Sequence, residues 1–377
     1  MSSKANRPEK TGRGGKATVL DVGRLAGVSG KTVSRVINGD GAIRASTRDR
    51  VKAAMEALDF QPNLAARSLR SARSFIICLL TAHFSSFYFS EVVRGAAEAC
   101  AARDYHLLIK ESPADRDSSA ALDSVLGRLK VDGFVVLPPL TDNAKLLDAL
   151  DRLGTPYVRI SPAADPNRSP SVTSDDASGV EALARHLWSL GHRRFGYVGG
   201  PATHGATHVR RRSFIEALLQ EGAAPEDISN YEMPETLVLE AERYRTSRAA
   251  ARTGARAVDA FMALPQPPTA LFAFSDEMAS GAVARAHQLG LSIPGDLAIA
   301  GFDDSDIGLI IHPPLTTIRQ PIIEMMEDAV RRLIERDSSR DLAPHAVQLL
   351  LRASTDPTMM DNLVDDTANE TSGRRQN

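Results

Sequence analysis

The stretch DVGRLAGVSGKTVSRVING, residues 21–39, holds two short helical patterns separated by one glycine. Gly27 lies where a tight turn needs a permissive backbone. Ser29 follows it and is a residue type that caps helices, so a second helix is predicted over residues 31–37. Because two helices joined by a short glycine turn are typical of a helix-turn-helix, this stretch predicts a small DNA-binding fold.

The residues on either side of this stretch complete a three-helix head. Thr18 and Asp21 have the spacing of a capping box, which places the start of the first helix. Ser46 and Asp49 repeat that spacing, and we expect Ser46 to cap a third helix. The apolar residues expected to form the core of the head are Val22, Leu25, Ala26, Val33, Ile37, Val51, Met55 and Leu58.

The charge of the chain is unevenly distributed. Residues 1–74 hold 15 Lys and Arg against 6 Asp and Glu, whereas residues 75–377 hold 30 against 41, within a net charge of −2. A basic head on an acidic body favours contact between the head and a polyanion, although a basic segment can also serve solubility alone. Residues 1–17 and 358–377 are polar and have little to bury, so we expect both segments to be disordered.

From residue 75 onward, short apolar runs alternate with longer amphipathic stretches. This alternation predicts the α/β class with mostly parallel sheets, and its length favours two sheets over one. The predicted buried strands are residues 75–80, 105–109, 133–137, 157–160, 195–198, 270–274 and 297–300. The predicted helices include residues 91–103, 177–190 and 278–289. Residues 231–254 are charged and less regular, and the pattern gives no account of 240–252.

Several classes of protein are disfavoured. No run of about 18 apolar residues is present and no apolar segment follows the basic N-terminus, so neither a membrane span nor a secretory signal is expected. Cys78 and Cys100 lie in apolar surroundings, which favours a reducing cytoplasm and excludes a disulfide framework. Residues 27–30 form a helix turn rather than a nucleophile elbow, and His204 and His208 lack a third metal ligand. We therefore expect no enzyme activity, metal or cofactor.

Strings in the head and in the body resemble one known family. The head strings are the opening stretch, STRDRVKAAMEALDFQPN at 46–63 and AARSL at 65–69. The body strings are GHRRFGYVGG at 191–200, FSDEMASG at 274–281, IPGDLAIAGFDD at 293–304 and PPLTTIRQP at 313–321. In this order they resemble the lactose-repressor (LacI/GalR) family of bacterial transcription regulators, over residues 18–357.

The resemblance implies a domain organisation and partners. It implies a helix-turn-helix domain at 18–62, a hinge helix and linker at 63–74, and an effector-binding and dimerisation domain at 75–357. That last domain would resemble periplasmic sugar-binding proteins, with two Rossmann-like subdomains joined by three crossovers. The family pattern further implies a homodimer that binds palindromic double-stranded operator DNA and responds to a small effector, with a sugar favoured. Because no leucine heptad follows Arg352, a dimer is favoured over a tetramer.

A recognition helix needs short donors near its N-terminus and longer donors one turn later to reach base edges. Arg35 can donate two hydrogen bonds to guanine, and the resemblance assigns base reading to Arg35 and Lys31, since Gly30 has no side chain. It also places Leu69, in the hinge, between base pairs. The alternatives are an Arg35 paired with a surface carboxylate and a merely flexible linker. The residues expected to contact DNA are Thr18, Ser29, Lys31, Thr32, Ser34, Arg35, Asn38, Arg44, Thr47, Asn63, Ala66, Arg67 and Leu69.

In open α/β sheets, ligands bind beyond the carboxyl ends of strands. Carboxylates and an arginine can pair with the vicinal hydroxyls of a sugar, and an aromatic ring can stack on its apolar face. For Asp303 the competing interpretation is turn chemistry and helix capping. The residues expected to contact the effector, from strand-end position and from the resemblance, are Tyr88, Phe89, Arg210, Ser275, Asp276 and Asp303.

The leading hypothesis is a sequence-specific transcriptional regulator, with repression of carbohydrate-utilisation genes as its favoured action. A carbohydrate-binding transport protein would have a similar body, but it would leave the basic head unexplained. A sugar kinase would need a phosphate-binding loop, which the sequence does not show. The identity of the effector, the operator and the direction of the response stay open at the level of sequence.

Overall fold

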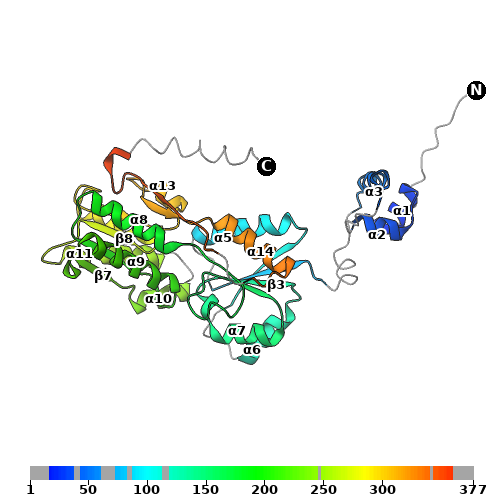
Figure 1. Ribbon diagram of the computed structural model, residues 1–377, viewed down its shortest axis with the longest axis horizontal. Helices are drawn as coiled ribbons and strands as arrows, with labels where there is room; N and C mark the ends of the chain where they lie inside the picture. The colour runs from blue at the N-terminus through cyan, green and yellow to red at the C-terminus, as the bar shows by residue number, and fades with distance from the viewer. Residues whose placement is uncertain are drawn as a thin grey trace, which may run out of the picture. The chain divides into compact units, whose positions relative to one another are not determined.

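The structure is a computed structural model that describes residues 17–37, 43–60, 73–82, 87–112, 119–244, 248–339 and 343–359. The chain divides into two compact units, Met1–Ser74 and Phe75–Asn377, which we call the head and the body (Figure 1). The expected disorder of residues 1–17 and 358–377 falls outside the described residues, except at Ala17, Thr358 and Met359. In the described ranges, no helix is both long enough and apolar enough to cross a membrane.

The described part of the head contains α1 (Val19–Ala26), α2 (Gly30–Ile37) and α3 (Ala45–Ala57). The predicted capping box is confirmed: the Asp21 N–H donates to Thr18 Oγ1 at 3.3 Å, and the Thr18 N–H donates to the Asp21 carboxylate at 3.0 Å. Gly27 ends α1 with φ +65°, a conformation that favours glycine. The Thr32 N–H donates to Ser29 Oγ at 3.2 Å, so the predicted cap of α2 is also confirmed.

Two predictions for the head are wrong. Leu25 is 56% exposed, because the buried face of α1 is set by Val22 and Ala26 and Leu25 lies about 100° around the helix from Ala26. Ser46 does not cap α3, because the extended backbone ends at Arg44 and the helix begins at Ala45, with no side-chain capping bond. The buried core of the head consists of Val22, Ala26, Val33, Val51 and Ala54, with Ile37, Met55 and Leu58 packed against it.

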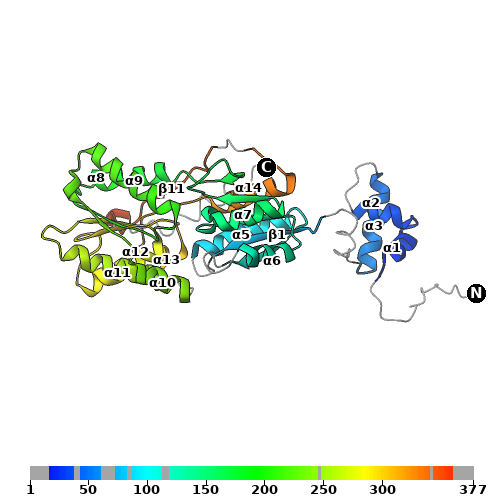
Figure 2. The ribbon, with the colours of Figure 1, turned by 90° about the horizontal axis from the view of Figure 1, so that it is seen from below.

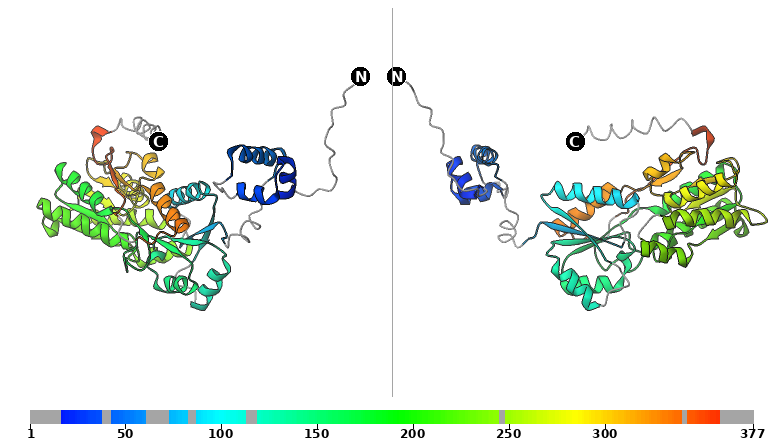
Figure 3. Two further views of the ribbon diagram at one scale, coloured as in Figure 1. Left: turned by 45° about the vertical axis from the view of Figure 1, so that its right-hand side comes forward. Right: turned by 180° about the vertical axis from the view of Figure 1, so that it is seen from behind.

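The first sheet of the body has the strand order β2-β1-β3-β4-β5, with every neighbouring pair parallel. Its strands are β1 (Ile76–Thr81), β2 (His106–Glu111), β3 (Gly133–Val136), β4 (Tyr157–Ile160) and β5 (Ser171–Val172). Two helix layers cover its faces (Figures 1 and 3). The layers are α5 (Phe87–Ala101) with α14 (Ile322–Glu335), and α6 (Ser119–Arg128) with α7 (Ala144–Leu153) and the 3-10 turn η1 (Leu140–Asp142).

The second sheet has the order β7-β6-β8-β9 and is also parallel. Its strands are β6 (Phe195–Val198), β7 (Ile228–Tyr231), β8 (Ala270–Ala273) and β9 (Ala298–Ala300). Figure 2 shows α8 (Asp176–Ser189) and α9 (Gly205–Glu221) on one side of it, and α10 (Glu235–Tyr244), α11 (Arg248–Met262) and α12 (Asp276–Gln288) on the other. Two short elements lie in the connections of this sheet: η2 (Pro225–Asp227) between α9 and β7, and α13 (Asp306–Ile310) after β9.

The order of the described elements takes the chain between the two sheets three times. The crossings lie between β5 and α8, between β10 (Thr317–Arg319) and α14, and between α14 and β11 (Gln348–Leu350). Strands β10 and β11 pair antiparallel and form a small ribbon of their own. The predicted α/β class with two parallel sheets is therefore confirmed.

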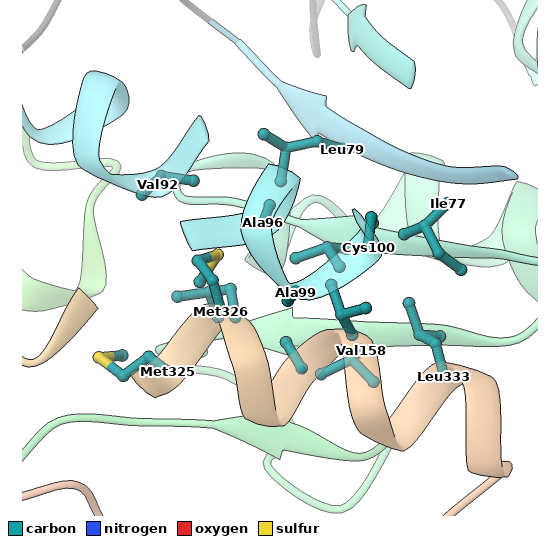
Figure 4. Packing of buried hydrophobic residues seen from close by; sticks show 14 of the residues in the cluster. Ile77, Leu79, Val92, Ala96, Ala99, Cys100, Val158, Met325, Met326 and Leu333 are labelled. Carbon is teal, nitrogen blue, oxygen red and sulfur yellow. The ribbon is translucent and has the colours of Figure 1, made fainter. Parts of the chain in front are cut away.

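Helix α14 comes from the last quarter of the described chain, yet it completes the core of the first sheet. Met325 and Met326 are fully buried and pack in one cluster with Val92, Ala96 and Val158 (Figure 4). Burial of such side chains contributes roughly 1.5–3 kcal/mol each. Helix α5 precedes the strands of the second sheet in the sequence, and α14 follows them. The core of the first sheet is therefore complete only after the chain has passed through the second.

The seven predicted strands are confirmed to within two residues at their ends. Strands β5, β7, β10 and β11, of two to four residues, escaped prediction. Strand β2 is half-buried rather than buried, since it lies at the edge of its sheet. The described residues of the stretch 231–254, which are 231–244 and 248–254, contain α10 and the start of α11. The buried face of α11, which includes Ala249, Thr253 and Ala257, is interrupted in the sequence by arginines.

Candidate DNA-binding face and ligand cavity

Helix α2 separates its apolar and polar side chains. Val33 is fully buried in the head, whereas Lys31 and Arg35, four residues apart, are exposed on a shared face. No acidic side chain occurs in the helix. The hydroxyl-bearing residues at and within the helix are Ser29, which is exposed, and Thr32 and Ser34, which are half-buried. Hydroxyls at the start of a helix and long cations one turn later match what phosphates and base edges require.

The other residues predicted to contact DNA are placed less uniformly. The Thr18 hydroxyl is part of the capping box of α1. Arg44 is exposed at the N-terminus of α3, and Thr47 is half-buried in its first turn, which no side chain caps. Such a helix end can receive a phosphate oxygen. Five predicted contacts lie outside the described residues and stay predictions: Asn38, Asn63, Ala66, Arg67 and Leu69.

The body holds a cavity of about 230 Å³ that is lined by residues of both sheets and their helices. Its walls include residues at or just after the carboxyl ends of six strands: Thr81, Leu137, Ser161, Pro201, Phe274 and Asp303. This is the position that parallel α/β sheets offer to ligands. Of the six predicted effector contacts, the structure brings five to this cavity: Tyr88, Phe89, Arg210, Ser275 and Asp303.

Arg210 lies in α9 and is buried at the cavity. Its Nε donates to the Asp176 carboxylate and its Nη1 to the Phe274 carbonyl, both at 2.8 Å, and Nη1 is 4.0 Å from Asp303 Oδ1. The guanidinium carbon lies 3.4 Å from the ring centre of Phe302 and 4.7 Å from that of Phe274. Burial opposes protonation of Arg210, but Asp176 and Asp303 outweigh it and raise its pKa.

Asp303 has φ +107°, which turns the chain sharply after β9. Gln320 Nε2 donates to its carboxylate at 3.0 Å, and Gln320 also lines the cavity. Burial raises the pKa of Asp303 well above its usual range, and Arg210 opposes that shift. Arg210, Asp303 and Gln320 therefore form a connected polar group at one wall of the cavity.

Two aromatic residues and Ser275 complete the predicted set at the cavity, and Glu277, which sequence reasoning did not single out, also lines it. Tyr88 and Phe89 lie in the first turn of α5, and burial raises the pKa of Tyr88, so its hydroxyl stays protonated. Ser275 Oγ accepts from the Met278 N–H at 3.4 Å and caps α12. Glu277, two residues further on, accepts from the Phe87 N–H at 3.0 Å and so joins the two halves of the body.

The structure corrects the prediction for Asp276. Its side chain is fully buried and is not part of the cavity wall. The carboxylate accepts from the Ser305 N–H and from Thr317 Oγ1, both at 2.7 Å. Burial raises its pKa to about 7, against the lowering effect of these donors. Asp276 therefore stabilises the loop after β9 instead of facing a ligand.

Sequence reasoning missed several polar or aromatic residues of the cavity wall, among them Asp176, His204, Phe274, Glu277 and Gln320. Asp176 is the first residue of α8, where an acidic residue is common because it favours the helix start. Nothing in the sequence therefore indicates that it pairs with Arg210. Gln320 follows a three-residue strand that gave no periodic signal. His204 packs edge-on against Phe274, and His208 Nε2 lies 3.0 Å from the Ala202 carbonyl. Among the described residues, no group of three His, Cys, Asp or Glu side chains is arranged for a metal.

Comparison with known proteins gives consistent results for both units. Residues 18–63 match the sequence profile of the bacterial regulatory proteins of the lacI family, and residues 184–355 match that of the periplasmic binding protein-like domain. The HTH-type transcriptional regulator DegA of Bacillus subtilis is 30% identical, over 91% of this chain and 99% of that protein. The catabolite control protein A of Priestia megaterium is 28% identical, over 88% and 97%.

Among solved structures, the complex of the transcriptional regulator CelR with cellobiose has a TM-score of 0.63 at 26% identity, covering 90% of this chain and 99% of that one. The lac repressor dimer bound to operator and the anti-inducer ONPF has a TM-score of 0.69, with the same coverage. At 23% identity, the second likeness shows the fold alone.

A helix-turn-helix head with an exposed cationic face, and a two-sheet body that holds a polar group inside a cavity, define a ligand-responsive DNA-binding regulator. The chain belongs to the LacI family of bacterial transcription regulators. Its relatives are regulators and not enzymes, so the catalytic alternative is set aside.

Proposed function

We propose that this protein represses carbohydrate-utilisation genes and that a small sugar, bound in the cavity, sets its affinity for a palindromic operator. The observation that carries this proposal is the group of Arg210, Asp303 and Gln320 beside Tyr88 and Phe89. Forked donors and acceptors suit vicinal hydroxyls, and aromatic rings suit the apolar face of a pyranose. The protein would act as a homodimer in the cytoplasm, where its operator lies.

Relatives support the repressor part of the proposal. CytR of Escherichia coli and PurR of Aliivibrio fischeri are named HTH-type transcriptional repressors, and they are 27% and 30% identical to this chain. CelR was solved with cellobiose, and a LacI-family regulator of Enterococcus faecium with ribose. For this chain, we propose that Lys31 and Arg35 read bases, that Leu69 lies between base pairs, and that the phosphates are held by Thr18, Asn38, Arg44 and Thr47.

The test is a gel-shift assay on DNA fragments from the neighbourhood of the gene, with and without a panel of sugars. We expect one fragment to be bound specifically and one sugar to change its affinity. Arg210→Ala should bind the fragment normally but lose the response, because its guanidinium orients the polar group in the cavity. A carbohydrate transport protein would bind the sugar and no fragment, which would contradict the proposal.

A further inference from the structure

Leu20, the second residue of α1, exposes 70% of its surface, more than any other large apolar residue in the described part of the head. The core of the head is reached from the other side of the helix, through Val22 and Ala26. A single exposed leucine needs no explanation by itself. Its place beside the N-terminus of α2 distinguishes Leu20, because the residues at that end of a recognition helix contact base edges.

Leu20 packs over the first residue of α2. A Cβ atom on Gly30 would lie 3.2 Å from Leu20 Cδ2 and 3.6 Å from Val19 Cγ1. Since Gly30 has no side chain, the isobutyl group of Leu20 occupies the place from which one would project. Gly30 directly precedes Lys31, and both Lys31 and Arg35 are exposed. Leu20 therefore borders the face of α2 to which we assign base reading.

The other side chains at the start of α2 are polar. Lys31 donates hydrogen bonds, and the hydroxyls of Ser29 and Thr32, whose oxygens are 3.0 Å apart, both donate and accept. Such groups suit guanine and phosphate oxygens. Leu20 suits neither, because a phosphate oxygen beside it would lose hydration without gaining a hydrogen bond. The one apolar feature of the major groove is the 5-methyl group of thymine, which an aliphatic side chain can contact.

We propose that Leu20 contacts the 5-methyl group of a thymine in each half of the operator, in place of the side chain that Gly30 lacks. The contact adds selection for thymine to the hydrogen bonds of Lys31 and Arg35. Because Leu20 lies against Gly30, the thymine is next to the bases that Lys31 contacts. This inference rests on the proposed function, since it specifies how the head reads its operator.

The first experiment removes the methyl group from the DNA alone. In the operator fragment found by gel shift, each thymine of one half-site is replaced in turn by deoxyuridine, which lacks only the 5-methyl group. Fluorescence anisotropy with the full chain measures the affinity for each fragment. We expect one position at which deoxyuridine weakens binding about three- to tenfold, the effect of one apolar carbon returned to water.

The second experiment assigns that methyl group to Leu20. Leu20→Ala should bind the thymine and the deoxyuridine fragment equally, and its affinity for random DNA should stay unchanged. Leu20→Met keeps an aliphatic chain and should restore part of the preference for thymine. Leu25→Ala is the matched control, because Leu25 is also exposed on α1 but lies about 140° around the helix from Leu20. This variant should keep the full preference of the wild type.

The outcomes separate the inference from the function on which it rests. If the wild type binds its operator specifically but is insensitive to deoxyuridine at every position, the inference is overturned and a sequence-specific repressor remains. A preference for thymine that persists in Leu20→Ala overturns the inference as well, since another residue then contacts the methyl group. If the wild type binds no fragment specifically, the proposed function fails, and the inference fails with it.

Discussion

Asp276 and Asp303 both follow buried strands of the second sheet, but the fold gives them different partners. Asp276 accepts hydrogen bonds from Ser305 and Thr317, which lie 29 and 41 residues along the chain. Asp303 lies at the cavity, where it accepts from Gln320. In the sequence both positions show an apolar run and then an acidic residue, so the sequence predicts the strand end. The sequence does not predict which of the two carboxylates is enclosed, because this depends on hydrogen-bond donors far along the chain, such as Ser305 and Thr317.

The buried carboxyl group of Asp276 predicts a pH effect on stability. Its pKa is raised to about 7 in the folded body, whereas an unfolded Asp titrates near about 3.9. Between these values the unfolded chain loses a proton that the folded chain keeps, so this group's contribution to stability is lost as the pH rises from about 4 through about 7. Asp276→Asn keeps an acceptor for the Ser305 N–H and removes the titration.

We therefore expect the stability of Asp276→Asn relative to the wild type to increase over that pH range. At 1.36 kcal/mol per pKa unit, the change is at most about 4 kcal/mol. Urea unfolding of both proteins at about pH 4.5, 6 and 8 measures it, and all other titrating groups cancel in the difference. A difference in stability that stays constant with pH would contradict the assigned protonation of Asp276.

Arg35 carries the prediction for base reading. It is exposed on the face of α2 that it shares with Lys31, one turn from the helix start. Arg35→Ala should weaken binding to the operator by about 1–3 kcal/mol and relax the preference at one base pair, as loss of a two-bond guanine contact does. Fluorescence anisotropy with the operator, its single-base variants and random DNA gives the answer. An equal loss on all of these sequences would indicate a phosphate contact instead.

At the scale of elements, length and regularity decide what the sequence predicts. The seven predicted strands lie in largely apolar stretches, and their positions follow from the sequence alone. Strands of two or three residues carry no periodicity, so β5, β10 and β11 depend on the neighbours that the fold brings to them. The first half of helix α11 shows the other limit. Its buried residues are Ala249, Thr253 and Gly254, which give little apolar signal, and arginines dominate the local sequence.

The contact between α11 and α12 positions Ala250 and Met278, which line the cavity, and two glycines make this contact possible. A Cβ atom on Gly254 would lie 1.8 Å from the Met278 carbonyl oxygen, and one on Gly281 would lie 1.8 Å from that of Ala251. Gly254→Ala should therefore force the helices apart and destabilise the body by about 1–3 kcal/mol. Gly127→Ala, also within a helix, meets Leu153 at an ordinary 3.4 Å and should be neutral or stabilising by about 0.5–1 kcal/mol.

Urea unfolding monitored by circular dichroism compares Gly254→Ala and Gly127→Ala with the wild type. Because α11 and α12 supply Ala250 and Met278, ligand affinity should fall in Gly254→Ala and stay unchanged in Gly127→Ala. Equal stability of the two variants would show that the close approach of α11 and α12 relaxes at no cost.

At the scale of the molecule, the two candidate sites lie in different units, and the charge of the chain follows that division. The basic residues concentrate in the head, and the body carries the excess of acidic residues, so attraction to DNA is confined to one part of the protein. The cavity is lined by residues of both sheets, which three crossovers and the bond from Phe87 to Glu277 connect. A ligand in it therefore contacts both halves of the body at once.

Control of the operator by a ligand requires that the two sites be thermodynamically linked. If the ligand changes operator affinity by some factor, the operator must change ligand affinity by the same factor, whichever direction the response takes. Typical couplings of about 1–3 kcal/mol correspond to roughly 5- to 150-fold. Calorimetric titration of the ligand, with and without saturating operator, should therefore reproduce the factor found when the operator is titrated with and without ligand. Arg210→Ala should bind operator with wild-type affinity and show neither effect, whereas Arg35→Ala should bind the ligand normally in the absence of DNA. An operator that leaves ligand affinity unchanged, while the ligand still alters apparent operator binding, would mean that the ligand acts somewhere other than on this protein.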